Sequence, residues 1–312
     1  MLRREVSIRS AGDVTTGADL TDAFPLVGRQ KQLEELGELL LAQHKLFCKR
    51  SKQYGDAQIA DLAKNKVIPT CCGASGIGKT RFGRDAPLEI LKQTKNEGIK
   101  SLLEDSADNG LVLRIGFEDE LRATERDKPE GAIALRLLFA YGATFSNFAE
   151  RFPSYNDLYQ WCELGSWDVA SVSQIVQKNV GERCMLLYVS VDETNHIPDD
   201  LLQKDWLKRA LSELTRCWHV ATSRILVVPF LSGTNPVSVY QISGQGPQNF
   251  QLPLLGVDEY QTILRHLYRQ PDFEPSSAFR NFLADVGFNP RLFQVHLISH
   301  KRRVAVFTIC TI

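Results

Sequence analysis

The chain has 312 residues, of which 43% are apolar and 24% charged, a composition typical of an ordinary globular protein. Its 37 basic residues equal its 37 acidic ones, so no overall charge attracts nucleic acid, and only a local basic patch could. No apolar run approaches the roughly 20 residues of a membrane helix, and we expect no membrane partner. Seven cysteines without a Cys-x-x-Cys pair indicate a reduced intracellular protein, in cytoplasm or nucleus, without structural zinc.

Two kinds of periodicity predict that strands and helices alternate along most of the chain. Short apolar runs predict buried strands at residues 66–72, 110–117, 184–193, 224–235 and 249–255. Apolar residues at helical spacing predict helices at residues 30–44, 80–95, most of 119–180 and 205–220, with a partly helical segment at 45–65. Pro87 should kink or end the helix that contains it. This alternation favours a parallel sheet that is covered by helices on both faces.

After residue 256 the pattern changes to helix alone. Within residues 257–268, Tyr260, Ile263 and Leu264 belong to one apolar stripe, which predicts a small C-terminal helical lid. The first residues are polar and aperiodic, which is typical of a flexible tail. We therefore divide the chain into tail, α/β core and lid, at residues 1–22, 23–256 and 257–312.

Two prolines conflict with the predicted sheet. Pro69 and Pro229 fall in strands that should lie side by side at its centre, where proline removes a ladder hydrogen bond. Either these strands are shorter than the apolar runs, with the prolines at their ends, or each strand contains a bulge.

The stretch GASGIGKT matches the phosphate-loop pattern G-x-x-x-x-G-K-[ST]. Its glycines allow backbone turns that direct N–H groups at phosphate oxygens, and a helix beginning near Lys79 adds its N-terminal dipole. Lys79 would bridge the β and γ phosphates, and the Thr80 hydroxyl would hold magnesium. The nucleotide-binding residues expected here are Gly73, Ala74, Ser75, Gly76, Ile77, Gly78, Lys79, Thr80 and Arg81.

A second acidic site follows the clearest buried strand, which ends in Asp192 and Glu193. An acid at the carboxyl end of a neighbouring parallel strand can reach the magnesium shell. We expect Asp192 to hold the ion through water, and Glu193 to orient and polarise the attacking water.

The order of these motifs also predicts the order of the strands. One strand, 110–117, separates the lysine motif from the acidic motif in sequence, as in phosphate-loop proteins whose sensor strand lies between the lysine and acid strands. Residues 224–235 would form that sensor strand. Its end would bring Ser232, Thr234 or Asn235 near the γ-phosphate, and we expect Asn235 to contact the nucleotide.

Two further stretches resemble motifs of AAA+ and STAND NTPases. FPLVGRQKQLEEL resembles the V-G-R box that precedes their phosphate loop, which implies that Val27 and Gly28 line the base pocket with Arg29 beside them. GFNPRLF resembles the G-x-P-R motif of their helical lid, which implies that Arg291 is a second sensor of the γ-phosphate. A rigid proline turn that presents a guanidinium suits an anion.

From residue 24 to about residue 300 the chain resembles the NTPase module of Crinkler-type effectors. The stretches that carry the resemblance are FPLVGR, GASGIGKTRFG, GAIALRLLFAYG and VDETNHIP. Such effectors are secreted by oomycetes and their relatives and often act in the host nucleus, which implies secretion into a host cell. The chain shows neither their L-x-L-F-L-A-K-type translocation segment nor a nuclease-like or kinase-like toxin domain.

These features together predict an α/β phosphate-loop NTPase that binds ATP with Mg²⁺ and hydrolyses it slowly. Lys79, Glu193 and Arg291 are the expected catalytic residues, and Thr80 and Asp192 the expected magnesium ligands. The alternative is an ATP-dependent switch that recruits a partner with negligible hydrolysis and does not need Glu193. A kinase is less favoured because no acceptor site is evident. The sequence does not decide between ATP and GTP as the nucleotide, nor whether the protein associates with itself or with a protein partner.

Overall fold

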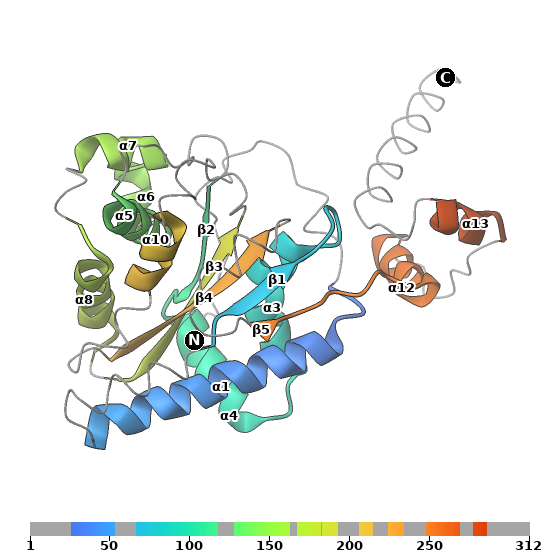
Figure 1. Ribbon diagram of the computed structural model, residues 1–312, viewed down its shortest axis with the longest axis horizontal. Helices are drawn as coiled ribbons and strands as arrows, with labels where there is room; N and C mark the ends of the chain where they lie inside the picture. The colour runs from blue at the N-terminus through green and yellow to red at the C-terminus, as the bar shows by residue number, and fades with distance from the viewer. Residues whose placement is uncertain are drawn as a thin grey trace.

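The computed structural model describes residues 26–53, 67–117, 128–162, 167–181, 183–192, 206–214, 224–233, 248–268 and 277–285. Within these ranges five strands form one all-parallel sheet in the order β2-β3-β4-β1-β5 (Figure 1). The strands are β1 Pro69–Cys72, β2 Val112–Gly116, β3 Met185–Asp192, β4 Ile225–Gly233 and β5 Gln248–Asn249. The predicted placement of β4 between β1 and β3 is confirmed.

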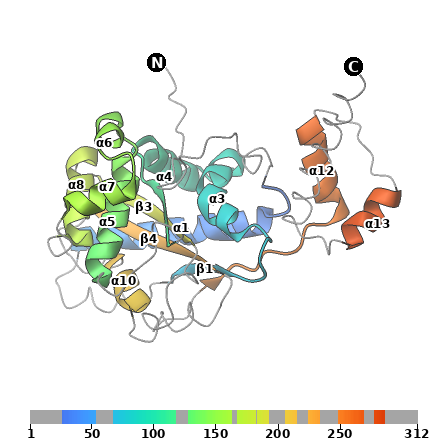
Figure 2. The same ribbon diagram turned by 90° about the horizontal axis from the view of Figure 1, so that it is seen from above.

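Helices cover both faces of the sheet. One face packs against α1 Gln30–Gln53, α3 Lys79–Gln93 and α4 Glu97–Asp108. The other packs against α5 Pro129–Gly142, α7 Tyr155–Trp161, α8 Val169–Val180 and α10 Trp206–Leu214, with the short α6 Ser146–Arg151 beside them. Two further helices, α12 Val257–Tyr268 and α13 Ser277–Asp285, lie to one side of the sheet (Figure 1 and Figure 2). No helix in the described ranges has the length and hydropathy needed to cross a bilayer.

The alternation of side chains along β3 decides which face its functional residue joins. Leu187 and Val189 point into the core under α5, whereas Leu186 and Tyr188 point into the core under α3. All residues of β3 are buried. Because side chains alternate with a period of two, the last residue, Asp192, lies on the α3 side. The acidic strand end is therefore directed at the helix that follows the glycine loop.

Helix α4 was not predicted, although its sequence has two ordinary signals. The Asn96 side chain caps the helix by accepting hydrogen bonds from the backbone N–H groups of Gly98 and Ile99, at 3.0 and 3.3 Å. Ile99, Leu102 and Leu103 have helical spacing and are buried in the core that α4 shares with α1 and α3. Helix α1 continues beyond the predicted 30–44 into the segment that was predicted to be partly helical, and ends at Gln53.

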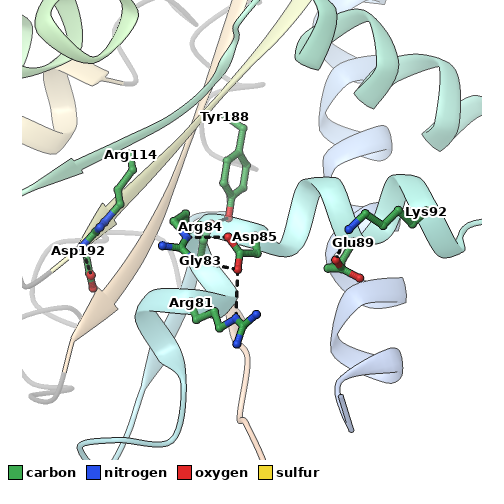
Figure 3. A network of polar contacts seen from close by, with 9 residues as sticks. All are labelled: Arg81, Gly83, Arg84, Asp85, Glu89, Lys92, Arg114, Tyr188 and Asp192. Atoms are coloured by element: carbon green, nitrogen blue, oxygen red, sulfur yellow. Dashed lines mark hydrogen bonds and ion pairs between the residues drawn. The ribbon is translucent and has the colours of Figure 1, made fainter. Parts of the chain in front are cut away.

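Helix α3 does not end at Pro87, which lies inside it. Proline cannot donate to the carbonyl four residues earlier, which belongs to Gly83. That carbonyl instead accepts a buried hydrogen bond of 2.8 Å from the Tyr188 hydroxyl of β3 (Figure 3). The sheet thus supplies the donor that the proline removes, which explains why the helix continues.

The sheet accommodates both prolines that conflicted with its prediction. Pro69 is the first residue of β1, a position that tolerates proline. Just before β4, the Arg224 carbonyl accepts a hydrogen bond from the backbone N–H of Met185 and so faces β3. The backbone groups of successive residues face opposite neighbours, so the nitrogen of Pro229, five residues later, faces β1. The pairing of β4 with β1 begins only at Leu231, after the proline. The missing N–H therefore falls outside that ladder.

The C-terminal part departs from the prediction in one respect. The strand predicted at residues 249–255 is only the two-residue β5, which pairs with Pro69 and Thr70 of β1. Pro253, further along the segment, cannot donate to a ladder. The predicted stripe of α12 is confirmed where it is described, since Tyr260, Ile263 and Leu264 are buried. With Leu255 and α13 they form an apolar cluster separate from the two cores of the sheet.

Candidate functional site

A glycine loop, residues 73–78, joins the carboxyl end of β1 to the first residue of α3. Gly76 and Gly78 have φ angles of 84° and 93°, in the left-handed region that glycine favours. A Cβ atom at Gly78 would meet nothing within 4 Å, so its backbone conformation and not crowding calls for glycine. The loop therefore has left-handed turns, which a phosphate-binding loop would need.

Lys79 begins α3 and folds back over the glycine loop. The residue is only 7% exposed, and its Nζ donates to the Ala74 carbonyl at 2.7 Å. An ammonium has three N–H donors. Among the described residues, Nζ uses one of these donors, on the Ala74 carbonyl. The others could bind an anion at the loop.

Asp192, at the end of β3, receives donors from three different elements. Its Oδ1 accepts from the Thr80 hydroxyl of α3 at 3.1 Å and from the Ser232 hydroxyl of β4. Its Oδ2 lies 3.3 Å from the Arg114 guanidinium of β2 (Figure 3). Asp192 is buried, with 2% of the residue exposed, so these donors compensate for the removal of its carboxylate from water. The predicted magnesium ligands Thr80 and Asp192 are thus in direct contact.

Sequence reasoning missed Arg114. The only local signal is an arginine within the apolar strand VLRIG, where a charge needs a partner. Its partner is identified by the register of two neighbouring strands, in which Gly116 lies opposite Asp192. The arginine side chain, two residues earlier on β2, reaches forward to the acid.

Arg81, predicted to contact the nucleotide, is engaged within α3. Its Nε lies 3.2 Å from the Asp85 carboxylate, and Arg84 bonds the same carboxylate at 2.7 Å (Figure 3). All three side chains are partly exposed. The first two turns of α3 therefore carry a compact ionic cluster beside the glycine loop.

The V-G-R segment contacts both the glycine loop and α12. The Arg29 guanidinium, in a residue 3% exposed, donates to the carbonyls of Ile77 and Gly28 at 3.3 and 3.2 Å. Burial lowers the pKa of Arg29, although a guanidinium remains charged. Val27 packs against the apolar cluster of α12, and a Cβ at Gly28 would come within 2.8 Å of the Glu259 side chain. The glycine loop and α12 thus both contact this segment.

Several predicted residues lie outside the described ranges, and their roles stay predictions. They are Glu193, Thr234, Asn235 and Arg291. Glu193 directly follows Asp192 in the chain.

The donor set around Thr80 and Asp192 fits Mg²⁺. A hydroxyl and a carboxylate are the hard oxygen donors that this ion prefers. The described residues hold no group of three or more His, Cys, Asp or Glu side chains that could enclose a metal by themselves. Mg²⁺ is usually held by one or two protein ligands together with phosphate oxygens and water, so a magnesium–phosphate ligand suits the site better than the bare ion.

The two cysteines before the loop behave as buried apolar side chains. Burial raises the pKa of the Cys71 thiol to about 12 and also raises that of Cys72, with Lys79 opposing the shift in both. The thiolate is the reactive form, so Cys71 should be inert near neutral pH. We expect iodoacetamide to label Cys71 in urea but not in the folded protein, as mapped by mass spectrometry. Equal labelling in both states would contradict this.

Among models of known protein families and among curated proteins, none matches this chain. What the site can do is therefore inferred from its own residues.

Proposed function

We propose that the protein is a phosphate-loop NTPase that binds a nucleoside triphosphate, in the first place ATP, with Mg²⁺ and hydrolyses it slowly. One observation carries the proposal: Thr80, which follows Lys79 at the end of the glycine loop, donates a hydrogen bond to the buried Asp192. The glycine loop, a lysine and two hard oxygen donors, which would bind phosphate and Mg²⁺, thus converge from β1, α3 and β3.

The order of the strands supports the same reading. Because β1, β4 and β3 are parallel, their carboxyl ends share one edge of the sheet, and the order places the end of β4 between the other two. Open parallel sheets bind ligands outside the carboxyl ends of their strands. The glycine loop, Ser232 and Asp192 all lie at that edge.

Each residue would have a distinct task. The loop N–H groups and the Lys79 ammonium would bind the β and γ phosphates, and Arg291 would add a second cation. Thr80 would hold Mg²⁺ directly and Asp192 through water; when bound, the ion neutralises charge on the phosphates. Glu193 would orient the attacking water and accept its proton. Asn235 would contact the γ-phosphate.

The lid would read the state of the nucleotide. Val27 and Gly28 would contact the base, and both lie against α12. In the AAA+, STAND and Crinkler-type modules that the sequence resembles, the corresponding parts form a nucleotide-driven switch. Closure of α12 and α13 on bound ATP and release after hydrolysis would give two states here.

The test is nucleotide binding and phosphate release by the purified chain, compared with Lys79→Ala. A hydrogen bond to a charged group contributes about 1.5 kcal/mol, so we expect about tenfold weaker binding of Mg-ATP by the variant. Phosphate release should fall with it. Lys92→Ala is the matched control, because Lys92 lies on the same helix, exposed and paired with Glu89.

The outcomes separate the alternatives. Absence of nucleotide binding by the wild type would overturn the proposal. Binding without phosphate release would favour the switch that recruits a partner, and in that case Glu193→Gln should leave its function intact. Transfer of the γ-phosphate to an acceptor other than water would revive the kinase reading.

A further inference from the structure

Arg114 and Asp192 form an ion pair that the proposed reaction does not explain. The guanidinium and carboxylate are 3.3 Å apart, and their side chains are 11% and 3% exposed. The arginine comes from β2, the strand at the edge of the sheet, and reaches the acid across the β2–β3 ladder. An ion pair on the surface contributes little to the free energy of unfolding. A pair this far from water constrains the orientation of both charged groups.

The donors are divided unevenly between the two carboxylate oxygens. The hydroxyls of Thr80 and Ser232 both donate to Oδ1, whereas Arg114 donates to Oδ2. The carboxylate turns about its Cβ–Cγ bond, and donors on Oδ1 alone do not hold Oδ2 in place. The Arg114 contact holds Oδ2, so donors on both oxygens together set the plane of the group.

The neighbouring arginines cannot easily replace it. Arg81 and Arg84 both bond Asp85 on their own helix, and Asp85 therefore holds their charge away from Asp192. Lys79 is directed at the Ala74 carbonyl of the glycine loop. Arg114 is thus the basic side chain found on Asp192 within the described residues.

We propose that Arg114 is a positioning residue, which orients the Asp192 carboxylate for magnesium and so sets how strongly Mg²⁺ improves nucleotide binding. The inference rests on the proposed function, because it needs a nucleotide at the glycine loop. Partners that orient metal-binding side chains typically contribute about 10- to 100-fold to metal affinity. Arg114 acts through Asp192 and contacts no reacting atom.

The experiment measures binding of a non-hydrolysable ATP analogue by calorimetry, once with Mg²⁺ and once with EDTA. The ratio of the two affinities is the gain due to magnesium. We expect Arg114→Gln to reduce this gain about tenfold and to leave the affinity in EDTA unchanged. Arg183→Gln is the matched control, because Arg183 is exposed and forms a long ion pair of 3.8 Å with the half-exposed Asp105. It should change neither the affinity with Mg²⁺ nor the affinity in EDTA.

Arg114→Lys provides a second variant that keeps the charge beside Asp192 and so protects the fold. An ammonium lacks the rigid, directional N–H groups of the guanidinium, so this variant should restore part of the gain, between the values of Arg114→Gln and the wild type. An unchanged magnesium gain in both variants would overturn the inference while leaving the proposed function intact. Equal losses of analogue affinity with Mg²⁺ and with EDTA would also overturn the inference, because they would indicate a purely structural role for Arg114. Absence of analogue binding by the wild type would overturn both proposals.

Discussion

We expect replacement of Asp192 by alanine to lower the free energy of unfolding by about 3 kcal/mol, because breaking a buried ion pair leaves its other charge without compensation. The change removes the carboxylate bound by Arg114, Thr80 and Ser232. Urea denaturation followed by circular dichroism measures the loss, provided the denaturant dependence stays the same. Among the single substitutions considered, this one should have the largest effect on stability.

A double variant separates the charge from the cavity. If the stranded guanidinium causes the loss, Asp192→Ala combined with Arg114→Met should be more stable than the sum of the two single changes predicts. Asp105→Ala serves as the control, since Asp105 is half-exposed, its partner Arg183 is exposed, and such pairs contribute about 0.5 kcal/mol. An Asp192→Ala loss no larger than that of the control would contradict the account.

Tyr188→Phe should lower the free energy of unfolding by about 2 kcal/mol, since a buried acceptor left without its donor costs about 1–3 kcal/mol. The acceptor is the Gly83 carbonyl, 2.8 Å from the hydroxyl, and Pro87 supplies no backbone donor for it. Burial raises the pKa of Tyr188 well above its usual value, so the hydroxyl keeps its proton and continues to donate. Chemical denaturation of the two proteins measures the difference.

The same substitution made with Pro87→Ala tests the cause. Alanine restores a backbone N–H that can bond the Gly83 carbonyl, so removing the Tyr188 hydroxyl should then cost clearly less. Equal costs in the two backgrounds would mean that the tyrosine acts through packing alone. Tyr159→Phe, in a partly buried tyrosine of the other core, gives a reference for losing a phenolic hydroxyl.

Much of the candidate site could be predicted because its parts are coded locally. The glycine loop, Lys79 and Thr80 lie within one short stretch, and Asp192 ends an apolar run. The order of these motifs also predicted that β4 lies between β1 and β3, which the sheet confirms. Local spacing and motif order were sufficient for these features. The contact of Ser232 with Asp192 was not specified by that order.

What could not be predicted depends on contacts between distant segments. Arg114 meets Asp192 only through the register of β2 on β3, which no local pattern reveals. The contact of Arg29 with Ile77 likewise joins segments far apart in the chain. Pro87 was expected to kink or end α3. The Tyr188 hydroxyl that compensates for it comes from a strand about 100 residues later, so the sequence around Pro87 could not reveal it.

The strand order also has a consequence for how the chain is made. β1 pairs with β4, opposite Leu231, and with β5, both about 160 to 180 residues further along the chain. On the ribosome, β1 and the glycine loop emerge early but must wait for most of the polypeptide before they gain neighbours. Closing so long a loop is slow. We expect the nucleotide site to be assembled late in folding, after α3 and α4 have formed, so a nascent chain that stops before β4 would expose an unpaired apolar strand that is prone to aggregation.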